Sequence, residues 1–455
     1  MSGLYGSLTV ALSALRAEQG AMEAAANNVA NVNTPGFSRL RPVIVPGEPV
    51  VVGSLSFGTG VVLERMQSLR DPILELRLHE ETQQQGYTNA IVDGMRQVEV
   101  MFSSTGSDLG SSITKFFNSL NQLSTDPGST PLRQSVLTAA GNLTDAFRNG
   151  SKNLDTLKSN LDLDVQQTVD QVNVLTAQIA KLNAQIADLE NVHEDASAFI
   201  DQQTQLIRNL SGLIDVSVVQ TEQGLSLTTS GGTALVTSNR NFVLDSQLGV
   251  DGVHHVVASG ADITTELSAG KLAGLIAVRD QKIPGLDADL DQLAVGLSTS
   301  LNAAHHAGFD VNGTPGGDFF VPPASSGAGA ASTMAVAITD PDLLAASSDG
   351  SSGSNGNVIK LAAVHDQAIV SGQTPIDFFS HMTFQVGSDI ANGQSELEAS
   401  GIVLRQLEDQ RASISGVSLD EEAANLVLYQ RAYQAAARVI TTVNEMLDTV
   451  MNLGR

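Results

Sequence analysis

The 455-residue chain contains no cysteine and no tryptophan, and it has only four tyrosines. The absence of cysteine excludes a disulfide framework, a thiolate zinc site and a cysteine nucleophile. Lysine and arginine together number 24 against 49 acidic residues, which gives a net charge of −25. Nucleic acids and anionic membranes both attract clustered cations, so this charge predicts no nucleic-acid partner and no membrane partner.

Long apolar runs are also missing. No stretch approaches the roughly 18 apolar residues that a membrane-spanning helix needs. The first residues, Met1 to Gly6, include neither a basic segment nor a long apolar core, so they do not predict a cleavable signal peptide. These absences predict a cytoplasmic protein or one that is exported by a route without signal cleavage.

Both ends of the chain carry apolar residues at a heptad spacing, which is typical of the seam of a coiled coil. The N-terminal run, interrupted by Glu18, predicts a helix that ends at 34–36, where a Pro-Gly turn follows Thr34. The C-terminal run predicts a helix over 418–453, with Ser418 and Glu421 forming a capping box. Seams of this length need a partner, and their residues form the predicted assembly interface. The members are Leu4, Leu8, Ala11, Leu15, Met22, Ala25, Val29, Val32, Leu426, Tyr429, Tyr433, Ala436, Ile440, Val443, Leu447 and Val450.

Heptad rows recur at 161–189 and again at 390–414, and a shorter helix is predicted at 195–210. Because these helical segments lie far apart in the sequence, we expect a bundle built from both chain ends. Alternating apolar residues and turn signals predict a small inserted β domain at 213–265. A further helix is expected at 269–304, followed by a loop rich in glycine and serine.

The predicted fold class is therefore α+β and mainly α, with long terminal coiled-coil helices, a helical bundle and a small inserted β domain. We expect residues 1–36 and 416–455 to form a terminal helical assembly domain. Residues 37–212 and 266–415 form the predicted helical bundle domain, which includes the loop 321–357, and residues 213–265 form the inserted β domain. Alternatively, both terminal heptad runs pack within one ordinary bundle.

The sequence offers little catalytic chemistry. None of the eight histidines stands in a His-Glu-x-x-His pattern, and we interpret them as solvated surface residues. The acidic residues Asp287, Asp289 and Asp291 are interpreted as a polar helix face, because positions two apart do not face each other on a helix. The segment 310–313 lacks the spacing of a calcium loop and predicts a solvated turn. No catalytic residue, metal site or cofactor is predicted.

Two terminal motifs resemble those of the bacterial flagellar axial proteins. The first motif spans 27–39, and its Pro-Gly-Phe-Ser-Arg ending is similar to that of the hook–filament junction proteins. Its matching residues are Asn28, Asn31, Asn33, Thr34, Pro35, Gly36, Phe37 and Ser38. The second motif spans 415–440, and its matching residues are Gly416, Leu419, Glu421, Glu422 and Tyr433. Two internal stretches, 270–275 and 307–320, agree with the same family.

This resemblance implies a structural, non-enzymatic subunit that polymerises into the junction between the hook and the filament of the flagellum. It implies an extracellular location, reached through the flagellar type III export apparatus. The implied partners are the flagellar hook protein, the second junction protein (hook-associated protein 3), further copies of this chain in a ring, and a cytoplasmic export chaperone. We place the chaperone on the C-terminal helix, 418–453, because an apolar helix face suits a groove on a helical partner.

The resemblance also leaves open questions. Larger members of the family carry a further β domain after the pair Phe319-Phe320, where this chain has only its loop 321–357. Another axial protein, from the hook or the rod, is the alternative function, because it shares both terminal helices. An enzyme of unknown type is a more distant alternative.

Overall fold

The computed structural model describes residues 2–52, 55–102, 109–192, 194–221, 224–351 and 353–453. Helices dominate and the sheets are small and antiparallel, which confirms the predicted mainly α fold class. The chain divides into two compact units. We name them the terminal unit (residues 1–84, 171–244 and 400–455) and the middle unit (residues 85–170 and 245–399). These units cut across the three predicted domains, whose independence stays a prediction.

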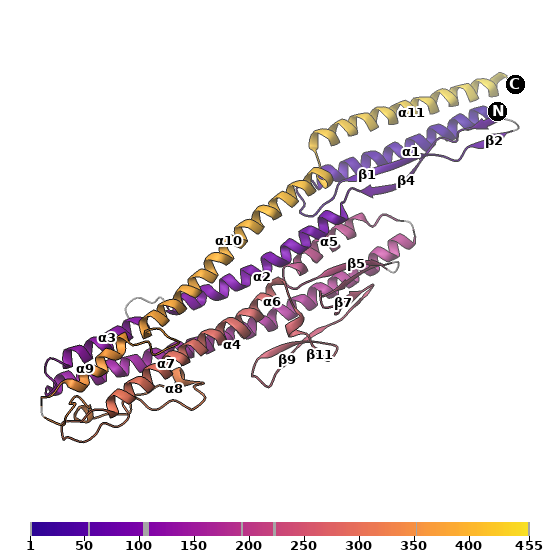
Figure 1. Ribbon diagram of the computed structural model, residues 1–455. Coiled ribbons are helices and arrows are strands. Elements are labelled where there is room, and N and C mark those ends of the chain that lie inside the picture. The colour runs from indigo at the N-terminus through magenta and orange to yellow at the C-terminus, as the bar shows by residue number, and fades with distance from the viewer. Residues whose placement is uncertain are drawn as a thin grey trace. The chain divides into compact units, whose positions relative to one another are not determined.

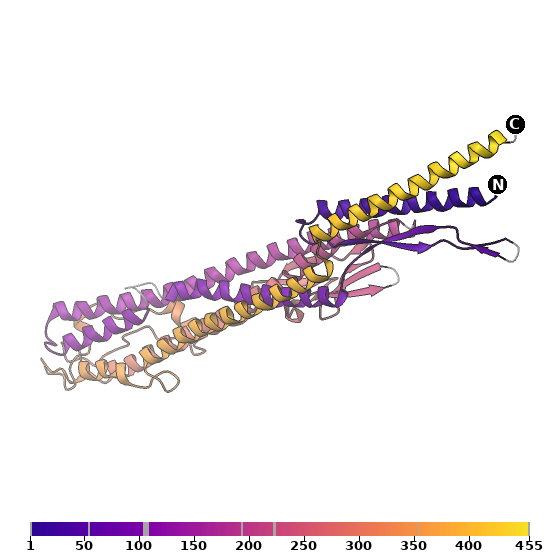
Figure 2. The same ribbon diagram turned by 90° about the horizontal axis from the view of Figure 1, so that it is seen from above.

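The two ends of the chain meet in the terminal unit. Helix α1 (Ser2–Ala30) and helix α11 (Leu419–Leu453) lie side by side, with both termini at the same end of the pair (Figures 1 and 2). Helix α1 stops before the predicted 34–36 boundary, because residues 31–36 already form turns. Helix α11 begins after Ser418, whose Oγ accepts a long 3.5 Å hydrogen bond from the Glu421 backbone N–H.

A β-hairpin follows α1 within the range that the sequence analysis assigned to a helical bundle. Strand β1 (Leu40–Pro46) pairs antiparallel with β4 (Val61–Ser68), and α1 packs against both strands. Farther along the hairpin, β2 (Val50–Val52) pairs with β3 (Leu55–Phe57). The sequence analysis missed these strands, although their β-branched residues fit a pleated ribbon better than a helix.

A second sheet completes the terminal unit. Helix α5 (Ser197–Ser211) confirms the helix predicted at 195–210, and a four-stranded antiparallel meander follows it. Its strands are β5 (Ser217–Thr221), β6 (Gly224–Thr228), β7 (Ala234–Thr237) and β8 (Arg240–Asn241). Asn183 holds this sheet by donating from its side-chain amide to the carbonyls of Leu225 and Ser238. Strands in the 213–265 segment were thus predicted correctly.

Three long helices contribute residues to both units, namely α2 (Pro72–Phe102), α4 (Thr130–Asn191) and α10 (Pro375–Ser415). The heptad rows at 161–189 and 390–414 lie within α4 and α10 respectively. Helix α4 is 62 residues long, and its row positions Val165, Val172 and Ile179 are fully buried. No helix among the described residues is both long enough and apolar enough to cross a bilayer.

The middle unit packs α3 (Leu109–Leu123) against α9 (Gly356–Ala363), and α7 (Ile283–His306) against α8 (Ala330–Thr333) and α9. Helix α6 (Gly270–Ala277) continues into α7 through a π-helical turn, Val278–Lys282. The sheet of the middle unit has the strand order β11-β10-β9, formed by β11 (Ala261–Asp262), β10 (His254–Ala258) and β9 (Leu244–Leu248). Short 3-10 turns occupy Thr264–Glu266, Pro341–Leu343 and Val364–Asp366.

The segment after α7 has little regular structure, as predicted, but it is bound closely to the helices of the middle unit. Phe319 and Phe320 are buried, and their ring centroids lie 5.8 Å and 6.0 Å from that of Phe116. The Asn302 side-chain oxygen accepts hydrogen bonds from the backbone N–H groups of both phenylalanines, at 2.9 Å and 2.8 Å. Buried side chains on α7 therefore replace regular backbone pairing in holding this segment.

Candidate assembly interface

The two predicted seams lie in the terminal unit, where α1 packs against α11. On α1, Ala11 and Ala25 are buried, and the other predicted positions are half-buried, namely Leu4, Leu8, Leu15, Met22 and Val29. Val32, which is also half-buried, lies in the turn that follows α1. On α11, Val443 is buried and Val450 is 45 % exposed, whereas the remaining positions are half-buried, namely Leu426, Tyr429, Tyr433, Ala436, Ile440 and Leu447. The terminal seams thus have a partner within the same chain.

Glu18, which interrupts the N-terminal seam, is an unusual residue of this helix pair. Its Oε2 atom is buried without a hydrogen-bond partner, and burial raises the pKa of its carboxyl group. Burial also raises the pKa of Tyr429 on α11, with added contributions from the carboxylates of Glu422 and Glu18. Glu18 therefore weakens a packing surface that its apolar neighbours would otherwise make continuous.

A second face of α1 carries small residues that the heptad analysis missed. Ala17, Ala21 and Ala24 are at most 3 % exposed, and Gly20 lies between them. A Cβ atom added at Gly20 would lie 2.5 Å from Leu63 Cδ2 on strand β4. The small side chains therefore allow the hairpin to approach α1 closely, and their spacing of three and four residues was the signal available in the sequence.

The first family motif connects α1 to the hairpin. Asn28 is buried, and its side-chain amide donates to the Leu40 carbonyl at 2.9 Å and accepts from the Leu40 N–H at 2.8 Å. The Asn31 amide donates to Asn27 Oδ1 at 2.6 Å, and the Thr34 hydroxyl donates to Asn31 Oδ1 at 3.1 Å. The asparagines at 28 and 31 therefore fix the turn that ends α1.

The end of the same motif is bound by charged residues from other helices. Gly36 adopts φ of +82°, a left-handed conformation that favours glycine, and its carbonyl accepts a 2.8 Å hydrogen bond from Arg411. Ser38 is buried; its N–H donates to Asp201, and its hydroxyl accepts from Arg70. Asn33 and Pro35 are exposed, and Phe37 is half-buried.

The second family motif meets the first through Arg39. The Arg39 guanidinium lies 2.7 Å from Glu421 Oε2 and 2.7 Å from Glu422 Oε1, and its backbone N–H donates to the Ser415 carbonyl. Glu422 is buried, whereas Glu421 and Leu419 are exposed. The Glu421 carboxylate thus pairs with Arg39 instead of the Ser418 N–H. Of the predicted capping box, only the hydrogen bond from the Glu421 N–H to the Ser418 hydroxyl is kept.

A side chain at Gly416 would collide with the Ala412 carbonyl oxygen, so glycine allows α10 to end there.

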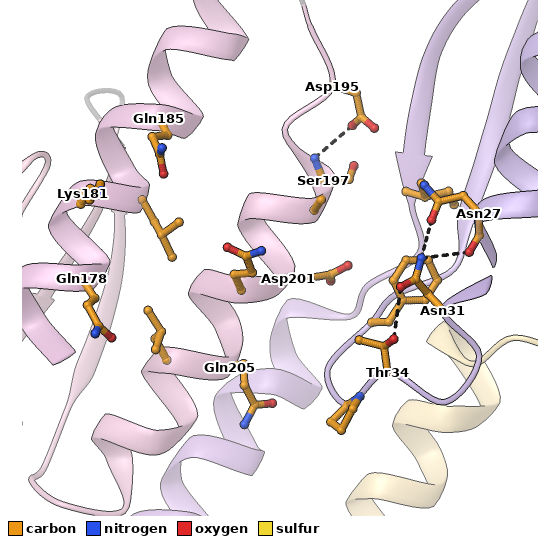
Figure 3. Close-up of a pocket in the computed structure, with 17 residues that line it drawn as sticks. Asn27, Asn31, Thr34, Gln178, Lys181, Gln185, Asp195, Ser197, Asp201 and Gln205 are labelled. Atoms are coloured by element: carbon orange, nitrogen blue, oxygen red, sulfur yellow. Dashed lines mark hydrogen bonds between the residues drawn. The ribbon is translucent and has the colours of Figure 1, made fainter. Parts of the chain in front are cut away.

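A pocket of about 760 Å³ lies beside the first motif (Figure 3). Asn27, Asn31 and Thr34 lie on one side of it, Gln178, Lys181 and Gln185 on the opposite side, and α5 contributes the wall between them (Figure 3). Its two carboxylates are already engaged, since Asp201 pairs with Arg70 at 2.7 Å and Asp195 accepts from the Ser197 N–H. The lining mixes amides with apolar side chains such as Phe37, Leu182 and Leu206, which suits a protein segment better than acid–base chemistry.

One histidine of the terminal unit is buried, beside the ion pairs of Glu75 with Arg208 and Arg411. It corrects the expectation that the histidines are solvated. His79 is 4 % exposed, and neither ring nitrogen has a hydrogen-bond partner. Burial lowers the pKa of His79 to about 4. The neighbouring Glu75 carboxylate lies 2.6 Å from Arg411 Nε and 3.2 Å from Arg208 Nη2.

In the middle unit, His254 and Arg279 form a network with Asp162. Arg279 is fully buried and lies 2.7 Å from Asp162 Oδ1, while His254 Nδ1 lies 2.6 Å from Asp162 Oδ2. Arg279 also pairs with Asp280 and donates to the His254 carbonyl. Burial would raise the pKa of Asp162, but hydrogen bonds from His254 and the Arg279 charge lower it. The π-helical turn places this arginine inside the unit, where it joins α4 to β10.

Other polar residues of the middle unit have specific hydrogen-bond partners. His305 is fully buried; one ring nitrogen lies 2.7 Å from the Gly317 carbonyl and the other accepts from the Ala345 N–H, so the ring is neutral. Asp287 accepts from the Ser151 hydroxyl, and Asp291 accepts from two backbone N–H groups beyond α7. Asp310 is buried and binds the Asn312 and Thr314 N–H groups.

His193 lies outside the described residues. No cluster of three metal-ligating side chains occurs in the described ranges.

Three family models match the chain. The flagellar hook-associated protein FlgK helical domain matches residues 95–320, the flagellar basal body rod FlgEFG protein C-terminal model matches 409–453, and the flagella basal body rod protein model matches 8–37. Flagellar hook-associated protein 1 of Bacillus subtilis is 30% identical, over 99% of this chain and 99% of that protein. The chain belongs to the flagellar hook-associated protein 1 family. The resemblance carried by its terminal motifs is confirmed.

Other relatives agree with this assignment. Flagellar hook-associated protein 1 of Escherichia coli is 25% identical and covers 97% of this chain and 98% of that protein. The solved structure of the flagellar hook junction protein FlgK from Burkholderia pseudomallei shares the fold, with a TM-score of 0.67 at 15% identity, covering 74% of this chain and 100% of that chain. As a member of the hook-associated protein 1 family, the chain is a structural component of the bacterial flagellum.

Proposed function

We propose that this hook-associated protein 1 homologue polymerises into the junction between hook and filament, outside the cell, without a catalytic role. Full-length similarity to the Bacillus subtilis protein is the observation that carries the proposal. The paired terminal helices support it, because α1 and α11 keep many apolar side chains half-buried and open to further contacts. We propose that both seams, with the two family motifs that brace them, form the assembly interface.

A hook or rod protein is the alternative within the same class. The rod-protein models match only the chain ends, at 8–37 and 409–453, whereas the hook-associated helical-domain model covers 95–320. That difference favours the junction.

We further propose four partners for this chain: the flagellar hook protein, hook-associated protein 3, further copies in a ring, and a cytoplasmic export chaperone. Export would proceed through the flagellar type III apparatus. We place the chaperone on α11, where Leu428, Val439 and Met446 are between 46 % and 60 % exposed. Exposed apolar rows of this kind promote aggregation, so a chaperone that covers α11 until export would protect the subunit.

Binding to isolated hooks tests the proposed function. We expect the purified chain to sediment with polymerised hooks and to label one hook end in electron micrographs. Replacing Ile440, a half-buried seam residue, with Asp should abolish this binding, because the charge would be buried without a partner. The control is Val219→Asp, on the exposed strand β5, which should bind normally. The proposal would be contradicted if the wild-type chain did not bind hooks, or if the Ile440→Asp variant bound them as well as wild type.

A further inference from the structure

The outer part of the hairpin is an apolar ribbon that packs on little of its own chain. Val50, Val51 and Phe57 on β2 and β3 are 52 %, 68 % and 53 % exposed. Val50 lies directly opposite Phe57 in the ribbon, so these two side chains share one face. A two-stranded ribbon is only marginally stable in water on its own, and its exposed apolar residues reduce that stability further. The ribbon would therefore be stabilised by packing against another apolar surface.

Helix α11 carries an apolar stripe outside its seam, formed by Leu428, Val439 and Met446. These side chains are 60 %, 46 % and 48 % exposed. Each stripe residue precedes a seam residue by one position, so the stripe lies about 100° around the helix from the seam that packs on α1. The stripe, like the ribbon, is left uncovered by the described part of the chain.

Helix α1 separates the ribbon from the stripe. It packs against α11 and also against β1 and β4, and it lies between α11 and the hairpin in Figure 1. The charges of the two surfaces are complementary. Glu48 is the only charged residue in 47–60, whereas residues 428–446, which span the stripe, carry two cations, Arg431 and Arg438, and one acid, Glu445. The two apolar surfaces therefore match each other but are kept apart within one chain.

We propose that the ribbon of one copy docks on the α11 stripe of the next copy, with Glu48 facing Arg431 or Arg438. The contact joins two different surfaces, so the two end copies of an open row still offer one free ribbon and one free stripe. Such a heterologous contact repeats into a ring or a helical row and does not close as a dimer. This inference rests on the proposed function, since it names the surfaces through which the subunits polymerise.

Engineered cysteines test the contact, because the natural chain has none. The double variant Phe57→Cys/Val439→Cys, oxidised after assembly on hooks or at high protein concentration, should give a ladder beyond dimers on a non-reducing gel. Each single variant should remain monomeric after oxidation. A mixture of the two single variants should stop at dimers, because each chain then offers only one reactive surface. Glu48→Arg should reduce the ladder, and Arg431→Glu/Arg438→Glu in the same chain should restore it.

The matched control is Phe57→Cys/Val219→Cys, which moves the second cysteine to another valine of the terminal unit that is 47 % exposed. An equally strong ladder from this control would overturn the inference, because random collisions would explain it. Dimers from Phe57→Cys alone would also overturn it, since they indicate a symmetric ribbon–ribbon contact. Hook binding without any ladder would refute the contact and leave the proposed function intact. Failure of wild-type chain to bind hooks would refute the function, whereas a ladder at high concentration would still support the contact.

Discussion

The middle unit and the terminal unit differ in the partners of their buried ionisable side chains. In the middle unit, Arg279 is fully buried, but it reaches two carboxylates and a backbone carbonyl. Both ring nitrogens of the buried His305 are likewise engaged. In the terminal unit, His79 and the Oε2 atom of Glu18 are buried without hydrogen-bond partners. A buried network whose hydrogen bonds are all made fixes one arrangement of its side chains. A buried polar group without a hydrogen-bond partner lowers the free energy of unfolding.

The same contrast extends to apolar residues. The middle unit buries its phenylalanine cluster around Phe116 and Phe319. The terminal unit leaves the ribbon and the α11 stripe exposed. A subunit built for polymerisation needs one part that is stable alone and one part that gains stability from neighbours. The comparison therefore predicts that mutations affect the two units in different ways.

The largest effect is expected from Arg279 in the middle unit. Arg279→Met should lower the free energy of unfolding by about 3–5 kcal/mol, because it leaves the Asp162 carboxylate buried without its main cation. Urea denaturation followed by far-ultraviolet circular dichroism measures the loss. The control is Arg96→Met, which removes an exposed ion pair with Asp93 and should cost less than about 1 kcal/mol. Equal effects of the two substitutions would show that the buried network contributes no special stability.

The second effect is an acid sensitivity of the terminal unit. The pKa of His79 is about 4 in the folded chain against an ordinary value of 6.5, so only the unfolded chain takes up this proton between those values. Stability from this group is complete above pH 6.5 and falls by about 3 kcal/mol as the pH drops to 4. His79→Leu should remove that part of the pH dependence, measured by denaturation at several pH values. The exposed His381→Leu is the control, and an unchanged acid slope in His79→Leu would contradict the assignment.

Much of the fold could be predicted from periodicity alone. The heptad rows at the two ends and at 161–189 indicate long helices correctly, because a seam repeated over several heptads has few other solutions. The hairpin at 40–68 was missed, since its short apolar runs have no clear period and follow a helix signal closely. Its docking surface on α1 depends on Gly20 and on three buried alanines, which score weakly on any hydrophobic pattern.

The site was harder to predict than the helices. The motif asparagines and Arg39 were identified by resemblance, but their partners Leu40, Glu421 and Glu422 depend on the tertiary fold. The burial of His79 and His305 was misjudged for the same reason, because contacts with residues far away in the sequence decide which histidine is buried. His254 finds its partner Asp162 at a separation of 92 residues. Local spacing carries no information at that range.

The smallest of the three effects concerns the joint between α1 and the hairpin. Asn28→Ala should destabilise the terminal unit by about 2 kcal/mol, because it strips the buried Leu40 N–H and carbonyl of their side-chain partners. Hydrogen exchange should rise in β1 and β4, while the middle unit keeps its protection, since neither Asn28 nor Leu40 belongs to that unit. Asn33→Ala, at an exposed position of the same motif, is the matched control and should leave exchange unchanged. If Asn28→Ala also loosened the middle unit, the two units would not be energetically separate, and the contrast between them would fail. If neither variant altered exchange in the hairpin, α1 would hold the hairpin through Gly20 and its alanine neighbours alone.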